Sequence, residues 1–382
     1  MVYVWARQMY LRDRVAAVSN RIAQVDNGQP LEVLEHGRRF VRVKTAKNEI
    51  GWIEERAVIT ADTYDKFNQL VEQHKNDPVV ATGVVRDEVY LHVKPGRDAD
   101  RFYLLAANTK VQLLTRVSVV KTLPNGQPLP KPVTPPAAAT DNSKNAPANG
   151  KNTASNKDKN TANGKKSASD AKSAAAATPP PAPEPPPMED WWLVRDGQGR
   201  VGWLLFGRVD IDVPDEIGTY AEGQRMVGAY LLNKVTDSEA PTPDHQVAQY
   251  VTILSPPRAG LPFDFDQVRV FTWSMKHHRY ETAYRLRPIQ GYFPLRVASQ
   301  PTAGGAPGFS FQLAGDASLM TDPATGQIRP AHARTVNFAL LGERVVRTGA
   351  DQWPIPVTHQ DDAQSKTGKN GKNAKAAKGK KK

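Results

Sequence analysis

The sequence predicts a mainly β protein in which two small barrels precede an antiparallel β domain, either a sandwich or a propeller-blade-like sheet. Short apolar segments that alternate with polar residues dominate the chain, and one ordered set of them occurs twice. The third observation is composition, which separates two low-complexity segments from the rest. The chain contains no cysteine, which excludes thiol nucleophiles, disulfides and cysteine-ligated metals.

The net charge of +12 belongs to the two low-complexity segments. Residues 121–188 contain nine lysines and four acidic residues, and residues 363–382 contain eight lysines and no acidic residue. The remainder of the chain is therefore close to neutral. The first segment is Pro-rich at both ends and contains no aromatic residue, so it cannot bury enough apolar area to offset the entropy of ordering it. We expect it and the C-terminal tail to be disordered.

The repeat consists of three apolar segments at matching intervals. Each copy has an aromatic residue eleven positions before a Gly-Trp pair. The segments are residues 28–34, 40–43 and 50–53 in the first copy, and 108–114, 191–194 and 201–204 in the second. Period-two alternation gives each strand one buried face.

We expect a structural role for the residues that close each copy. Gly51 and Gly202 are predicted to let the backbone bend tightly before Trp52 and Trp203. Phe40 is predicted to join them as a structural residue.

The ordered set resembles the bacterial SH3-type (SH3b) domain. The resemblance rests on Leu11-Arg12-Asp13, on residues 31–34 and on Gly51-Trp52-Ile53, whereas the second copy departs from it with His92-Val93. It implies small β barrels that commonly accompany cell-wall enzymes and recognise peptidoglycan peptides or protein partners.

These observations predict five regions. Residues 61–75 have helical apolar spacing that ends before Asp77-Pro78. Residues 121–188 are interpreted as a loop between adjacent strands, because closure entropy grows only slowly with loop length. The regions are barrel 1 (1–60), a helical connector (61–82), barrel 2 with the disordered insertion 121–188 (83–213), the β domain (214–348) and a disordered Lys-rich tail (349–382).

Seven strands are predicted in the β domain, and the third is apolar on both faces, which is typical of a central strand. They are residues 225–235, 248–254, 267–274, 281–286, 292–297, 308–313 and 334–341.

The candidate ligand-binding residues are exposed aromatics and arginines. Because Trp191 and Trp192 are adjacent on a strand, we expect one ring to point inward and the other outward. The outward ring is either a stacking platform for a sugar or peptide or is simply packed against a loop. The arginines either meet anionic groups or lie on a solvated face. The set is Trp5, Tyr10, Arg38, Arg39, Trp191 and Trp192.

Two polar clusters in the β domain are assigned no chemistry. The His277-His278 turn is interpreted as a solvated hairpin in which His277 and Glu281 point to opposite sides, and not as a metal site. Asp264 and Asp266 are interpreted as solvated loop residues and not as paired carboxylates. We therefore predict no catalytic residue, metal or cofactor.

The function predicted is non-catalytic binding or scaffolding at the bacterial cell envelope, with peptidoglycan or an envelope protein as partner. One alternative is a cytoplasmic polyanion-binding protein acting through its Lys-rich tails, which support only nonspecific contact with nucleic acid. Another is a hydrolase sited in residues 214–348. Met1 begins directly in a strand, which indicates the cytoplasm unless a leader is missing from this chain; with a leader we expect the periplasm or cell envelope. No apolar run is long enough to cross a bilayer, and the oligomeric state is left open.

Overall fold

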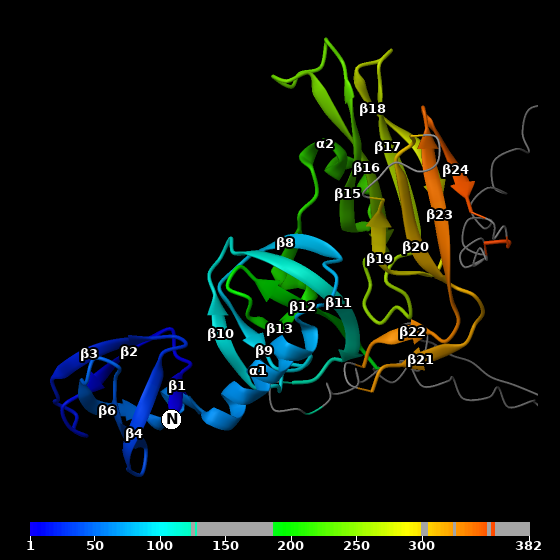
Figure 1. Ribbon diagram of the computed structural model, residues 1–382. Coiled ribbons are helices and arrows are strands. Elements are labelled where there is room, and N and C mark those ends of the chain that lie inside the picture. Colours follow the sequence, from blue (N-terminus) through cyan, green and yellow to red (C-terminus); the bar gives the residue numbers. More distant parts are fainter. Residues whose placement is uncertain (124–126, 128–185, 299–304, 324–325, 350–352, 356–382) are drawn as a thin grey trace, which may run out of the picture. The chain divides into compact units, whose positions relative to one another are not determined.

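The computed structural model describes residues 1–123, 127, 186–298, 305–323, 326–349 and 353–355 (Figure 1). The described part is mainly β, as predicted, with several antiparallel sheets. Our predictions for the 121–188 insertion and the 349–382 tail lie almost wholly outside the described residues. None of the helices in the described ranges is both long and apolar enough to span a membrane.

The first barrel is an antiparallel sheet with the strand order β3-β2-β6-β5-β4-β1-β7. Alternate residues of its strands point inward and form one apolar core, which includes Val4, Leu11, Val43 and Ile53. Its elements are β1 (Val2–Val4), β2 (Gln8–Arg12), β3 (Arg21–Asp26), β4 (Pro30–His36), β5 (Phe40–Lys44), β6 (Ile50–Glu54), the 3-10 turn η1 (Glu55–Ala57) and β7 (Val58–Thr60).

The second barrel repeats this order strand for strand, as β10-β9-β13-β12-β11-β8-β14. The main difference is length, because β11 and β12 contain 11 and 9 residues where β4 and β5 contain 7 and 5. Its elements are β8 (Ala81–Val85), β9 (Val89–His92), β10 (Arg101–Leu105), β11 (Lys110–Val120), β12 (Met188–Asp196), β13 (Val201–Leu205), η2 (Phe206–Arg208) and β14 (Val209–Ile211).

The strand registers of the two barrels also coincide. Arg42 pairs with Trp52 in the first barrel, and Leu193 pairs with Trp203 in the second. A β-bulge lies at Leu34 between β4 and β5, and another lies at Leu114 between β11 and β12. Residues of the two barrels can therefore be matched one to one across these strands.

The two matching glycines, Gly51 and Gly202, permit a close approach of strands, not the tight bend that we predicted. A Cβ atom on Gly51 would lie 2.8 Å from the Cβ of Leu11, and one on Gly202 would lie 2.6 Å from the Cβ of Leu91. Neither glycine has a positive φ. Glycine is required because β6 and β13 cross directly over β2 and β9.

Helix α1 (Ala61–His74) connects the barrels and confirms the predicted helix. Its buried residues are Phe67 and Leu70, at the helical spacing seen in the sequence. Contacts between the barrels add to this connection. The side-chain amide of Asn27 donates to the carbonyl of Phe102 at 3.0 Å, and the backbone N–H of Leu104 donates to the Asn27 Oδ1 at 3.0 Å.

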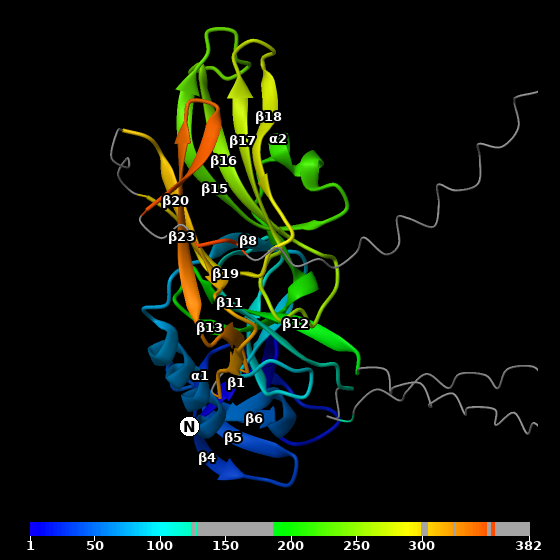
Figure 2. The same cartoon turned by 90° about the vertical axis from the view of Figure 1, so that its right-hand side faces the viewer.

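The C-terminal region forms two four-stranded antiparallel sheets with apolar inner faces, which makes it a β-sandwich (Figure 2). All seven predicted strands are present, whereas the short strands β21, β22 and β24 were not predicted. The first sheet has the order β15-β16-β17-β18 and the second β19-β20-β23-β24. The elements are α2 (Asp215–Gly218), η3 (Thr219–Ala221), β15 (Arg225–Thr236), β16 (Gln246–Ser255), β17 (Gln267–Ser274), β18 (Arg279–Leu286), β19 (Gly291–Val297), β20 (Gly308–Ala314), β21 (Leu319–Thr321), β22 (Ile328–Pro330), β23 (Ala333–Leu341) and β24 (Arg344–Thr348).

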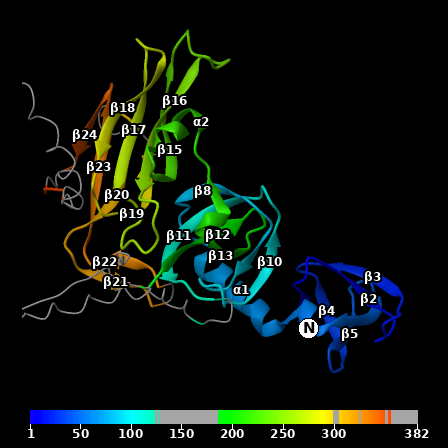
Figure 3. The same ribbon diagram turned by 180° about the vertical axis from the view of Figure 1, so that it is seen from behind.

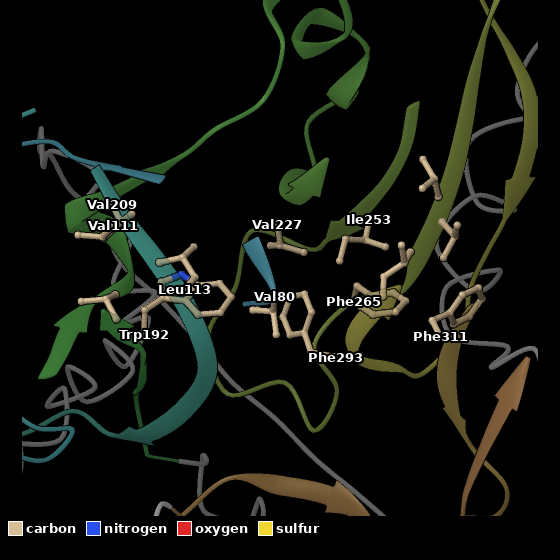
Figure 4. Close-up of a cluster of buried hydrophobic side chains, with 14 of the residues drawn as sticks. Val80, Val111, Leu113, Trp192, Val209, Val227, Ile253, Phe265, Phe293 and Phe311 are labelled. Carbon is tan, nitrogen blue, oxygen red and sulfur yellow. The ribbon is translucent and has the colours of Figure 1, made fainter. Parts of the chain in front are cut away.

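One apolar core runs from the second barrel into the sandwich (Figure 4). The ring of Trp192 lies 5.7 Å from that of Phe293, which in turn lies 6.0 Å from that of Phe265. Phe265 continues to Phe311 at 5.7 Å, inside the sandwich. The second barrel is thereby packed against the sandwich by its own core residues.

A buried cluster of charges lies beside this core and corrects our prediction for Asp264. Arg116 Nη1 lies 3.3 Å from Asp190 Oδ2, and Arg116 Nε lies 3.5 Å from Asp264 Oδ1, with all three side chains almost inaccessible. Arg225 Nη2 is 3.7 Å from Asp190 Oδ2. Asp264 is not solvated as expected: it also accepts a hydrogen bond from the N–H of Phe293 at 2.9 Å, and burial raises its pKa although Arg116 opposes this.

Asp266 also departs from the solvated loop that we predicted. Its side chain is half-buried, and Oδ1 has no hydrogen-bond partner among the described residues. This burial raises the pKa of Asp266 to about 6.

We expect Arg116→Met to lower the free energy of unfolding by about 3–5 kcal/mol, because it leaves the buried Asp264 carboxylate without its cation. Arg86→Met removes the exposed pair with Asp210 and should cost much less, because a surface ion pair is weak in water. Chemical denaturation of both variants measures the difference. Equal losses would show that the buried cluster contributes no more than a surface ion pair.

Candidate functional site

The first barrel presents a partly apolar outer face formed by Leu34, Phe40, Arg42, Ile50 and Trp52 from β4, β5 and β6. These residues alternate with the inward-pointing core residues, so they point away from the barrel core. Leu34 is 44% exposed and Ile50 is 41% exposed, while Phe40 and Trp52 are half-buried. Large apolar side chains at outward strand positions distinguish this face from a strand face that carries only polar residues.

Charged residues surround the outer face in pairs. Lys44 Nζ lies 3.2 Å from Glu32 Oε2, and Arg42 Nη1 lies 3.6 Å from Glu35 Oε2. All four side chains are at least one-third exposed. Such pairs are weak in water, so the charges remain available to an incoming ligand.

A cleft of about 410 Å³ opens at one end of this face, where β5 begins and β6 ends. Arg56 Nε lies 2.5 Å from Glu54 Oε2 inside it, and the backbone N–H of Glu55 donates to the carbonyl of Arg39 at 3.0 Å. The cleft therefore offers cations and carboxylates around an aromatic ring, a combination that suits a ligand carrying both charges. Its lining residues are Arg39, Phe40, Glu54, Glu55 and Arg56.

The structure brings only some of the predicted site residues to this cleft. Arg39 lines it, and the Trp5 indole N–H donates to the carbonyl of Arg56 at 2.7 Å. Arg38 is exposed but is not part of the lining. Tyr10 lies on β2, beneath the guanidinium of Arg21 at 4.4 Å.

Trp5 contacts the second barrel as well. The ring of Trp5 lies edge-on to that of Tyr90 at 5.3 Å, and the guanidinium of Arg101 lies over both rings. Packing against the second barrel therefore accounts for much of the burial of the Trp5 ring.

The prediction that one ring of the Trp191-Trp192 pair points to solvent is wrong. Trp191 is 2% exposed and Trp192 is 0% exposed. Trp192 lies in the core shared with the sandwich, and Trp191 donates from its indole N–H to Glu189 Oε1 at 3.2 Å, with its ring 5.0 Å from that of His92. Both faces of β12 are covered, so neither tryptophan offers a stacking platform.

Sequence reasoning missed six residues of the site. Glu54, Glu55 and Arg56 directly follow the Gly51-Trp52-Ile53 motif, and this charged run was a usable signal. Leu34 was missed because it lies at a β-bulge, whereas Ile50 and Arg42 occupy outward positions that alternation does reveal and that were not considered as site residues.

The histidine turn lies between β17 and β18, as predicted, but one detail was wrong. His277 Nδ1 and Glu281 Oε1 are 2.8 Å apart, so these side chains converge and do not point to opposite sides. His278 Nδ1 lies 2.8 Å from Asp237 Oδ2, which also accepts from the Trp273 indole N–H at 2.7 Å. Within the described ranges, no three metal-ligating side chains form a group that could hold an ion.

Hydrogen bonds perturb both members of the His278–Asp237 pair. Donation from Trp273, from the backbone N–H of Glu239 and from His278 lowers the pKa of Asp237 to about 2. The hydrogen bond with Asp237 raises the pKa of His278 above its usual range. The pair fastens the β17–β18 hairpin to the segment after β15.

A second open cleft, of about 430 Å³, lies in the sandwich. Asn233, Gln249 and Trp273 contribute side chains to its wall, and Met275 and Leu341 contribute exposed apolar groups. Amides and apolar side chains of this kind suit binding and supply no evident nucleophile with its base.

Comparison with known proteins supports the resemblance for the first barrel. Residues 9–59 match the family described as "Bacterial SH3 domain". No curated protein matches the sequence. A solved structure described as an NlpC/P60 family protein from Bacillus cereus ATCC 10987 is 15% identical, with a TM-score of 0.20. The match covers 33% of this chain and 52% of that one, so the chain spans about half of that protein, and a likeness of this degree says nothing about activity.

We expect Trp203→Ala to lower the free energy of unfolding by about 3–5 kcal/mol, because its side chain is 2% exposed. Trp52→Ala, at the matching position of the first barrel, should cost clearly less because Trp52 is only half-buried. Denaturant titration of the two variants measures this contrast. Similar losses would mean that the outer faces are equally covered.

The His278–Asp237 pair predicts a pH dependence. Because the folded pKa of His278 is raised, its contribution to stability is complete below the unfolded pKa of about 6.5 and is lost as the pH rises through the folded value. An NMR titration should place the His278 midpoint above 6.5, and Asp237→Asn should lower it. A midpoint that does not respond to Asp237→Asn would contradict the pairing.

Proposed function

We propose that this protein is a non-catalytic binding or scaffold protein of the bacterial cell envelope, and that the first barrel holds its ligand in the cleft beside Phe40. The match of residues 9–59 to the bacterial SH3 domain supports a binding role. The observation that carries the proposal is the open cleft, in which Arg39 and Arg56 stand beside Glu54 and Glu55.

The charges of the cleft favour a peptide of the cell wall as ligand. Peptidoglycan stem peptides carry carboxylates and amines on a short chain, so arginines and glutamates around one aromatic ring complement both. An envelope protein with a similarly charged segment is the other partner that the cleft suits. Hydrogen bonds to charged groups of this kind contribute about 1.5–3 kcal/mol each.

We also propose that the second barrel is a further SH3-type domain interrupted by the 121–188 insertion. The identical strand order and register support this, as does the pairing of β11 directly with β12 on either side of the insertion. In this proposal, the second barrel acts as support for the first and for the sandwich, because its outer face is buried.

Binding to purified peptidoglycan tests the proposed function. The full chain should be retained at physiological salt, and Arg39→Glu should weaken retention about tenfold or more, which corresponds to about 1.4 kcal/mol. Arg38→Glu is the matched control, because it makes the same charge change at the adjacent exposed position outside the cleft.

Retention within about twofold of the parent is expected for Arg38→Glu. If both variants lose retention equally, binding depends on net charge and not on the cleft, and the proposal is wrong. Retention that survives both substitutions would place the binding elsewhere and equally reject the cleft.

A further inference from the structure

The outer face of the first barrel has a counterpart in the second barrel that is covered. The strand registers match Leu34 with Leu114, Phe40 with Trp191, Arg42 with Leu193, Ile50 with Val201 and Trp52 with Trp203. All five residues of the second barrel are between 0% and 3% exposed and belong to one apolar cluster.

Helix α1 supplies part of the cover in the second barrel. Leu70 and Val71 of α1 pack into the cluster, and α1 lies against β13, the strand that carries Trp203 (Figure 3). The outer face of the second barrel therefore accepts an α-helix that presents two neighbouring apolar side chains on one of its faces.

A basic residue holds the C-terminal end of that helix. Arg195 Nη2 donates to the carbonyls of His74 at 2.5 Å and Lys75 at 3.0 Å, which are among the groups that a helix end leaves without partners. Arg195 Nη1 also donates to the side-chain oxygen of Gln112 at 3.4 Å. The contact therefore combines apolar packing with a cation at the carbonyl end.

The first barrel repeats this arrangement, and none of the helices in the described part of the chain lies on it. Lys44 occupies the position of Arg195, and Glu32 occupies that of Gln112. Lys44 Nζ lies 3.2 Å from Glu32 Oε2. Leu34 and Ile50 remain more than 40% exposed where Leu114 and Val201 are buried. Arg42 replaces Leu193, so this copy of the surface also carries a positive charge at its centre.

We propose that the outer face of the first barrel docks an amphipathic α-helix of a partner protein. The helix presents neighbouring apolar side chains to Leu34, Ile50 and Trp52, and an acidic side chain to Arg42. Its C-terminal carbonyls lie at Lys44, as those of α1 lie at Arg195. Helix α1 of the chain itself is already engaged with the second barrel and is not the occupant of this face.

This surface is distinct from the cleft of the proposed function, although Phe40 borders both. Leu34, Lys44 and Ile50 do not line the cleft. A substitution at Ile50 therefore tests the helix site while leaving peptidoglycan binding in place, and each proposal can fail without the other.

The test uses a fluorescent synthetic peptide with the sequence of residues 60–76, stabilised as a helix through its solvent-facing positions, and the full chain. We expect saturable binding by fluorescence anisotropy. Ile50→Lys should weaken it about tenfold or more, and Lys44→Glu should weaken it through repulsion of the helix C-terminus. Ile22→Lys is the matched control, because Ile22 is a 43% exposed isoleucine on β3 of the same barrel, outside the face.

Three outcomes would overturn the proposal. One is the absence of saturable binding, and another is binding that Ile50→Lys and Ile22→Lys weaken equally. The third is a dimer, found by sedimentation, that Ile50→Lys dissociates, since the occupant would then be a second copy of this chain.

A peptide in which both Leu70 and Val71 are replaced by glutamate should not bind, because the apolar contact is lost.

Discussion

The extended pairing of β11 with β12 is the constraint on which the arrangement of the second barrel and the sandwich depends. Their ladder continues from Val111 opposite Asp196 to Val120 opposite Met188, well past the length of the matching strands in the first barrel. The ladder carries Asp190, in the extension, and Arg116 and Trp192, just before it, to the loop that precedes β17, where a charge cluster and an apolar core form together. Ladder hydrogen bonds fix the backbone there, so the side chains meet the sandwich without a further cost of ordering the backbone.

The same strand order serves two different purposes in the two barrels. In the second barrel, apolar residues point both inward and outward, and α1 and the extended strands cover the outward set. In the first barrel, Arg42 and the exposed Leu34 and Ile50 leave the matching face open. A barrel buried on both sides is suited to support, whereas one with a free face and a charged cleft is suited to binding.

The prediction from sequence was strongest where a signal is local. Period-two alternation located the seven strands of the sandwich, and apolar spacing located α1 to within one residue of its end. Asp264 was misjudged because two carboxylates flanking Phe265 look like loop residues until Arg116, far away in the chain, is brought beside them. The candidate site was predicted only in part for the same reason: Trp5 and Arg39 were identified, but their neighbours Glu54, Glu55 and Arg56 come together with them only in the folded barrel.

The sequence by itself determined the mainly β class, the connecting helix and the strands of the sandwich, because each depends on the periodicity of neighbouring residues. Only the tertiary structure decided which faces are covered. The sequence pattern predicts one inward and one outward ring for Trp191 and Trp192. Both are buried, because α1 contributes to the cover on one face of β12 and the core shared by the second barrel and the sandwich lies on the other. Burial is a property of what packs on a strand, and a strand's own residues do not specify its neighbours.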